Sequence, residues 1–176
     1  MRDDDLPGLI GNLLRYGTVA SVDAASARLT VKVGDIETQP IRWLLGPHGA
    51  TRMWSLPTVG EQVLLLAPEG DIEGAIALRG VAFQRFPPAG NGKRELIRFA
   101  DGAEVAYDPE GHKLEALLPD GATATIVAPG GITLEADVLV KGTLTAETDV
   151  VADGISLKNH RHGQVQPGSG QSGKPA

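Results

Sequence analysis

Apolar and polar positions alternate over most of the chain, in short stretches that follow one N-terminal segment with helical spacing. Apolar residues at positions 6, 9, 10, 13 and 14 share one helical face and Asp5 can cap it, which predicts a helix within residues 1–15. Between residues 16 and 84, alternation bounded by turn residues predicts strands at 18–22, 28–33, 41–45, 61–66 and 74–80. This part of the chain is therefore predicted to be almost entirely β.

These five short strands predict one small β-domain over residues 16–84. A closed Greek-key barrel such as an OB-fold fits their number and length, and a small sandwich or an SH3-like barrel is an alternative. Residues 85–95 contain Pro87, Pro88, Gly90 and Gly92 and are predicted to be a linker. The expected fold class is all-β.

Turn signals recur at short intervals through residues 96–158. They lie at 101–102, 110–111, 120–121, 130–131, 142 and 153–154, and each separates stretches long enough for one short strand. Within 132–146 the alternation is clean, because Ile132, Leu134, Val138 and Leu144 share one parity while the other is mostly Thr, Glu and Asp. Each strand is expected to have an apolar inner face and a polar outer face, with the acidic residues as solvating charge.

A strip of such strands cannot bury its own apolar face. A single-chain solenoid needs more coils than these residues supply, and a second sandwich needs larger side chains. Three identical chains can instead bury their apolar faces against one another around one axis, as in a β-prism or an intertwined β-helix. This arrangement needs neither more coils nor larger side chains. We therefore favour a homotrimer for residues 96–158.

Composition strengthens this division of the chain. The sequence has only seven aromatic residues, two Trp, two Tyr and three Phe, and none follows Tyr107. Residues 1–95 carry 11 acids and 10 bases (net −1), whereas residues 96–158 carry 11 acids and 4 bases (net −7). A second half without large side chains is expected to have no globular core of its own.

Charge and residue content also exclude several functions. An acidic chain, net charge −6, lacks the Lys/Arg surface that binds phosphates, so nucleic acid is not an expected partner. No cysteine is present for a disulfide, a thiolate nucleophile or a Cys-based zinc site. No carboxylate pair suggests an acid and a base, so no catalytic residue is assigned and no enzyme is expected. The acidic start and the short apolar run at 63–67 indicate neither a signal peptide nor a bilayer helix, and we expect a protein that is soluble when made.

Two of the four histidines form a His-x-His motif. His48 and His112 lie in predicted loops and are interpreted as solvated residues. His160 and His162 point to the same side of an extended segment, because residues i and i+2 share a face. One chain supplies two ring nitrogens, whereas three chains supply six as two stacked triangles. An octahedron of six nitrogens suits Fe, Ni or Co better than zinc. Because such a site has no open position for a substrate or water, the predicted role of the metal is structural.

Four stretches of the sequence resemble one known family. They are residues 13–19 (LLRYGTV), 54–64 (WSLPTVGEQVL), 97–107 (IRFADGAEVAY) and 159–162 (NHRH) with the Gly/Ser tail that follows. In this order they resemble baseplate assembly protein V, the central spike of contractile-tailed phages and R-type bacteriocins.

The resemblance implies an N-terminal OB-fold, a trimeric β-helical spike and a pointed apex over residues 159–176. It implies one iron ion per trimer, held by His160 and His162 of each chain. Some relatives also hold calcium and chloride ions nearer the shaft, and no ligands for them are assigned here. The stretch between Tyr107 and His160 is short for the family, so a stubby spike is expected.

The expected function follows from the same resemblance. Sheath contraction drives the tube, with the spike ahead of it, into the outer membrane of the target cell. The implied partners are the baseplate hub, the tail tube and the bacterial outer membrane. The implied location is the virion tail baseplate or the tip of a tail-like particle, after synthesis in the host cytoplasm. A type VI secretion spike is the alternative, and an OB-fold nucleic-acid-binding protein is a weaker one.

Overall fold

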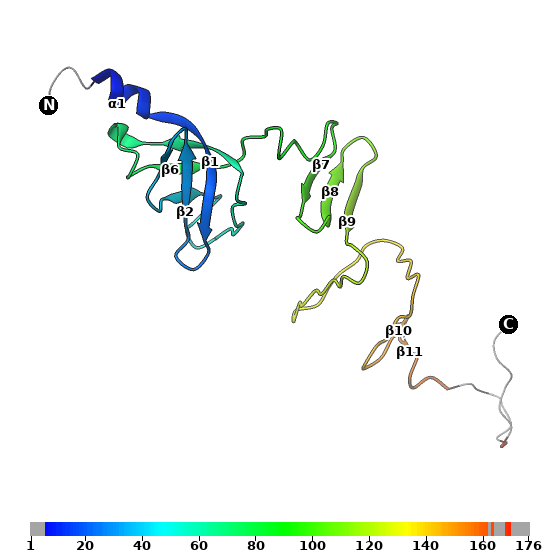
Figure 1. The fold of residues 1–176 in the computed structure, drawn as a ribbon. Coiled ribbons are helices and arrows are strands. Elements are labelled where there is room, and N and C mark those ends of the chain that lie inside the picture. The colour runs from blue at the N-terminus through cyan, green and yellow to red at the C-terminus, as the bar shows by residue number, and fades with distance from the viewer. Residues whose placement is uncertain (1–5, 162, 164–167, 170–176) are drawn as a thin grey trace. The chain divides into compact units, whose positions relative to one another are not determined.

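The computed structural model describes residues 6–161, 163 and 168–169, and it divides the chain into two units. The first unit covers residues 1–124 and the second residues 125–176, and each is considered by itself (Figure 1). The first begins with helix α1 (Leu6–Asn12), which lies within the segment predicted to be helical. Among the described residues, no helix has the length and apolar character needed to cross a bilayer.

A six-stranded sheet follows the helix. Its strands are β1 (Leu14–Asp23), β2 (Arg28–Val33), β3 (Ile36–Glu37), β4 (Arg42–Leu44), β5 (Gln62–Leu66) and β6 (Ile76–Leu78). A short 3-10 turn, η2 (Pro68–Gly70), precedes β6. The order in the sheet is β3-β2-β1-β5-β6-β4, with β4 and β6 parallel and the other pairs antiparallel.

One backbone pair closes this sheet into a barrel. Leu29 on β2 and Ile41, the residue before β4, exchange two hydrogen bonds, with N–O distances of 3.0 and 2.8 Å. The barrel order is then β1-β2-β4-β6-β5 and back to β1, which is the closed OB-fold barrel predicted from the sequence. The short strand β3 was not predicted. It lies outside the closed ring and pairs only with β2.

The core lies inside this barrel. Alternate residues of the strands are buried, as the period of two requires. The buried cluster consists of Val19, Leu29, Val31, Val33, Ile41, Trp43, Val63, Leu65, Ala67, Ala75 and Ala77. Gly17 lies so close to β2 that an added Cβ would be 2.3 Å from Val31 Cγ1, so this position of β1 requires glycine.

A partly buried ion pair fixes the loop that precedes β5. Arg79 meets Glu61 in a two-point contact, with Nε to Oε1 at 2.8 Å and Nη2 to Oε2 at 3.0 Å. The same guanidinium donates to the carbonyl oxygen of Ser55 at 2.7 Å. Arg79 thus ties residues 55–61 to the end of β6.

A second, three-stranded sheet occupies the rest of the first unit. It is the antiparallel meander of β7 (Glu95–Arg98), β8 (Glu104–Asp108) and β9 (Lys113–Leu117). Hydrogen bonds from Arg98 and Arg94 hold the pKa of Glu104 below its usual value. The opposite face of this sheet, away from Glu104, is apolar. It carries Ile97, Val105, Tyr107 and Leu114, and each of these side chains is more than 40% exposed. This sheet therefore presents an apolar face that the described part of the chain leaves uncovered.

The second unit forms little paired structure. Its strands are β10 (Val151–Ala152) and β11 (Ile155–Ser156), which form one small hairpin (Figure 1). Residues 118–150 contain no strand, so the strands predicted within 132–146 are not formed by the chain alone. They stay a prediction for the trimer, because alternation specifies which face each residue occupies but does not supply a neighbouring strand. Among the described residues after Ala106, none is buried, as the absence of large side chains predicts.

Replacing Arg79 tests the clamp on the barrel. Arg79→Ala is expected to lower the free energy of unfolding by about 1–2 kcal/mol, because it removes charged hydrogen bonds and leaves Glu61 without its partner. Arg79→Lys keeps the charge but loses the two-point geometry, so an intermediate loss is expected. Urea unfolding followed by tryptophan fluorescence measures both. Lys32→Ala, on an exposed position of β2, serves as the control.

Candidate metal centre

The structure places the four histidines in different surroundings. His48 is exposed near the wall of a barrel pocket, and His112 lies in the turn between β8 and β9 with φ of 49°. Neither contributes to a cluster of possible ligands. His160 follows the β10–β11 hairpin, whereas His162 lies outside the described residues. The geometry of the predicted pair is therefore visible for His160 alone.

The hairpin before His160 is built by its turn residues. Asp153 and Gly154 have φ of 47° and 78°, the two positive values that a type I′ turn requires. This turn matches the right-handed twist of the two strands, and Asp-Gly is among its preferred sequences. Beyond the strands, the Leu157 amide donates to the carbonyl oxygen of Val150 at 2.8 Å.

Asp149 fastens the base of this hairpin. Its Oδ1 accepts hydrogen bonds from the Val150 amide at 2.8 Å and the Lys158 amide at 3.1 Å, and its Oδ2 accepts one from the Ser156 hydroxyl at 2.5 Å. The hydrogen bond from Ser156, followed by that from Lys158, holds the pKa of Asp149 below its usual value. One carboxylate therefore joins the two ends of a ten-residue loop.

Ser156 extends the network to the histidine. Its hydroxyl oxygen accepts from the Asn159 amide at 2.8 Å, and its carbonyl oxygen accepts from the His160 amide at 3.0 Å. The His160 ring nitrogen Nδ1 lies 3.0 Å from the carbonyl oxygen of Leu157 and 3.2 Å from that of Ser156. The hairpin thus fixes both the backbone and the ring of His160.

These contacts determine which nitrogen of His160 can bind a metal. A carbonyl oxygen only accepts, so Nδ1 carries the proton and donates it. In the neutral ring the lone pair is then on Nε2. A metal-binding histidine commonly donates its other ring N–H to a backbone carbonyl in this way, which orients the ring. His160 therefore has the arrangement of a ligand that would bind through Nε2.

One chain does not assemble a site from its described residues. Within residues 6–161, 163 and 168–169, no three His, Asp or Glu side chains come together as possible ligands. His160 is exposed, and it borders a pocket of about 270 Å³ lined otherwise by Val150, Ala152, Ile155 and Leu157. Ile155 and Leu157 are 61% and 67% exposed. The histidine thus lies beside an apolar surface that a neighbouring chain can cover.

Asp149 and Ser156 are the site residues that the sequence did not identify. The acidic residues of the outer face are interpreted from the sequence as solvating charge and are assigned no ion, whereas the Asp149 carboxylate also accepts three hydrogen bonds. The sequence does identify the Asp-Gly turn at 153–154. An Asp just before a hairpin with such a turn is the signal that could have indicated Asp149 as a hydrogen-bond acceptor. The contact itself depends on how the loop closes.

Comparison with known proteins gives three matches. Residues 15–81 match the model of the type VI secretion system/phage-baseplate injector OB domain, and residues 154–176 match the GpV apex motif. The chain is 34% identical over 151 residues to the spike protein of Escherichia phage P2, an alignment that covers 85% of this chain and 69% of that protein. The two family models cover the barrel and the segment that contains both histidines, and Asp149 lies before the second.

Removal of the Asp149 carboxylate tests its role in the hairpin. Asp149→Ala is expected to speed hydrogen exchange of the Val150 and Lys158 amides several-fold, because both lose their acceptor. Acid should lower the protection factors of the same two amides, each protection factor being the exchange rate of an unprotected amide at that pH divided by the observed rate. The depressed pKa stabilises the hairpin above the ordinary aspartate value of about 4, and this stabilisation is lost as the pH falls through the lower value. Exchange followed by NMR measures both, with Asp137→Ala as the control; unchanged exchange would contradict the role.

Proposed function

The chain belongs to the family of phage baseplate spike proteins, and from this premise we propose that it forms the trimeric tip that pierces the outer membrane of a target cell. Its role is structural, and its place is the tail baseplate of a virion. The observation that carries the proposal is the exposure of alternating apolar residues after β9. Ile132, Leu134 and Leu144, which share one parity, are 59%, 68% and 71% exposed in the single chain.

Such exposure needs a partner, and the sequence pattern favours two further copies of this chain. Soluble monomers rarely leave long apolar stretches in contact with water. The inner parity of 132–146 carries residues no larger than leucine, which fit a narrow space near an axis. Unpaired backbone in this stretch also needs strand neighbours. Three intertwined chains supply both the strands and the cover.

The trimer accounts for mechanical strength. When each strand pairs with strands of other chains, no short edge can separate alone, and opening one part requires opening its neighbours. The acidic residues of the outer parity keep the shaft hydrated, whereas its apolar residues face the axis. A shaft of this kind, pushed by a contracting sheath through the baseplate hub ahead of the tail tube, can transmit force to a membrane.

A metal at the apex completes the proposal. His160 and His162 from three chains supply six imidazole nitrogens for one iron ion. For His160 the hydrogen bond at Nδ1 supports ligation through Nε2. A closed set of six ligands gives the ion a structural role, which is to hold three chain ends together. The proposal includes no catalytic residue and no nucleic-acid partner.

A type VI secretion spike is the second candidate. The description of the matched OB domain covers both type VI secretion and phage-baseplate injectors, which favours it specifically. The two candidates share the barrel, the trimer and the apex. They differ in the machine that drives the spike.

Sedimentation tests the trimer. The native protein is expected to sediment at three times the mass of one chain at micromolar concentration. Leu134→Glu places a charge on the inner parity and should shift the protein towards monomers, whereas Thr133→Glu, on the outer parity of the same stretch, should leave the trimer unchanged. Monomers of the native protein at micromolar concentration would refute the proposal.

Elemental analysis tests the apex. Purified protein should contain about one iron ion per three chains, and the His160→Ala, His162→Ala double variant should contain none and still sediment as a trimer. His48→Ala with His112→Ala is the matched control, which should retain the metal. Iron retained by the His160/His162 double variant would place the metal elsewhere.

A further inference from the structure

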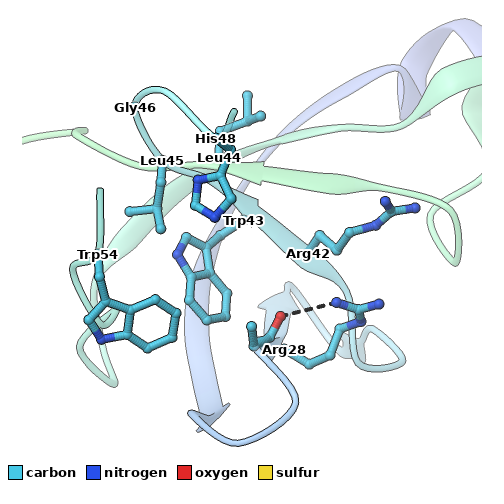
Figure 2. A pocket seen from close by; sticks show the side chains of 9 residues that line it. Arg28, Arg42, Trp43, Leu44, Leu45, Gly46, His48 and Trp54 are labelled. Atoms are coloured by element: carbon cyan, nitrogen blue, oxygen red, sulfur yellow. Dashed lines mark hydrogen bonds between the residues drawn. The ribbon is translucent and has the colours of Figure 1, made fainter. Parts of the chain in front are cut away.

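The OB-fold barrel has a pocket outside the residues assigned to the shaft and the apex. It is half-open, has a volume of about 370 Å³, and is lined by residues of β2, β4 and the loop that follows β4 (Figure 2). The lining side chains that matter here are Arg28, Arg42, Trp43, Leu45, His48 and Trp54. In the barrel order, β2 and β4 are the second and third strands, and that face is where OB-folds commonly bind their ligands.

A buried donor in the pocket has no acceptor. Trp43 is 9% exposed, and its indole Nε1 has no hydrogen-bond partner. Figure 2 shows the nitrogen edge of this ring on the side where Leu45 and His48 lie. An unsatisfied buried N–H is destabilising, and native structures usually give a buried Trp N–H a partner. Trp54, 59% exposed, lies beside it with ring centroids 5.8 Å apart. The pocket thus presents two indoles and one unused donor.

Two like charges face each other at the rim. Leu29 and Ile41 form an antiparallel pair. Arg28, the residue before Leu29, is therefore opposite Arg42, the residue after Ile41. Like charges directly opposite each other on paired strands are destabilising. Arg28 donates to the carbonyl oxygen of Ala27 at 3.1 Å, and in the described part of the chain neither arginine forms an ion pair. No acidic side chain lines the pocket.

We propose that this pocket binds a peptide segment of a neighbouring baseplate protein, a segment in which an Asp or Glu adjoins a large apolar residue. The carboxylate bridges Arg28 and Arg42, a peptide carbonyl oxygen accepts from Trp43 Nε1, and the apolar side chain packs against the exposed indole of Trp54. Each feature of the pocket is then satisfied by a group that such a segment carries. The source of the peptide rests on the proposed function, whereas its chemistry rests on the pocket.

Other ligands satisfy fewer of these features. A nucleic acid needs a track of positive charge along its backbone, and residues 1–95 have a net charge of −1. A neutral oligosaccharide needs acceptors as well as donors for its hydroxyl groups, and no carboxylate or side-chain amide lines the pocket. The opposed arginines and the apolar walls together favour a carboxylate on an apolar peptide.

A displayed library of random heptapeptides identifies the ligand chemistry without knowledge of the partner. Peptides that bind the full chain are selected. Those that also bind the Arg28→Glu, Arg42→Glu double variant are then removed. The selected sequences should pair Asp or Glu with a neighbouring aromatic residue or Leu. The two tryptophans of the chain both line the pocket, so binding of a synthetic copy should change the tryptophan emission directly. Replacing its acidic residue by the amide should weaken binding at least about tenfold.

A single variant separates a binding site from a structural feature. Arg42→Glu places an opposite charge across from Arg28, so the free protein should become more stable, with a melting temperature higher by about 1–5 °C, while peptide affinity falls at least about tenfold. Lys32→Glu, also on β2 but away from the pocket, should leave affinity unchanged.

Several outcomes would overturn the proposal. They are the absence of any sequence enriched over the double variant, enrichment without acidic residues, and affinity unchanged in Arg42→Glu. Displacement of a bound peptide by oligo-dT or a sulfated oligosaccharide at lower concentration would assign the pocket to that class instead. None of these depends on the oligomeric state, which sedimentation measures separately, so failure here and failure of the proposed spike are distinguishable.

Discussion

The structure of this chain depends on one constraint, which is that a β-strand must pair its backbone groups and cover its apolar face. The N-terminal barrel meets both demands within one chain. The exchange of hydrogen bonds between Leu29 and Ile41 closes the ring of strands, and alternate side chains then fill the interior. Residues 118–150 have the same alternation but neither strand neighbours nor cover. One physical requirement thus separates a domain that is complete within one chain from a segment that, in the proposed trimer, is completed by other chains.

This division suits a protein that must be both attached and stiff. The core of the barrel lies within residues 19–77 of one chain, so the barrel needs no second chain to complete it. The shaft in the proposed trimer acquires its order only when three chains meet, so its stability depends on chain concentration. The meander of β7–β9 is intermediate. Its backbone is paired within one chain, whereas one face still exposes Ile97 and Leu114.

The sequence predicted what local pattern determines and missed what depends on contacts between distant residues. The barrel strands follow from alternation, and the turn at 153–154 follows from Asp-Gly. The strands predicted within 132–146 stay a prediction for the trimer, because the pattern specifies the faces of a strand but not its neighbouring strands. Asp149 was missed because its three donors lie up to nine residues away, and the opposed arginines because their alignment follows from the register of β2 against β4.

The hairpin before His160 shows how local order can serve assembly. In the proposed trimer, six imidazoles must converge on one ion, and each flexible ligand adds an entropic cost to binding. The Asp149–Ser156 contact closes the loop, and the Ser156 and Leu157 carbonyls hold the backbone and the ring of His160. Part of that cost is thus met when a single chain folds. Metal binding can then stabilise the trimer with more of its free energy, because less is consumed in ordering the ligands. In the proposed trimer, the Asp149 carboxylate, eleven residues before His160, thus becomes part of the tip.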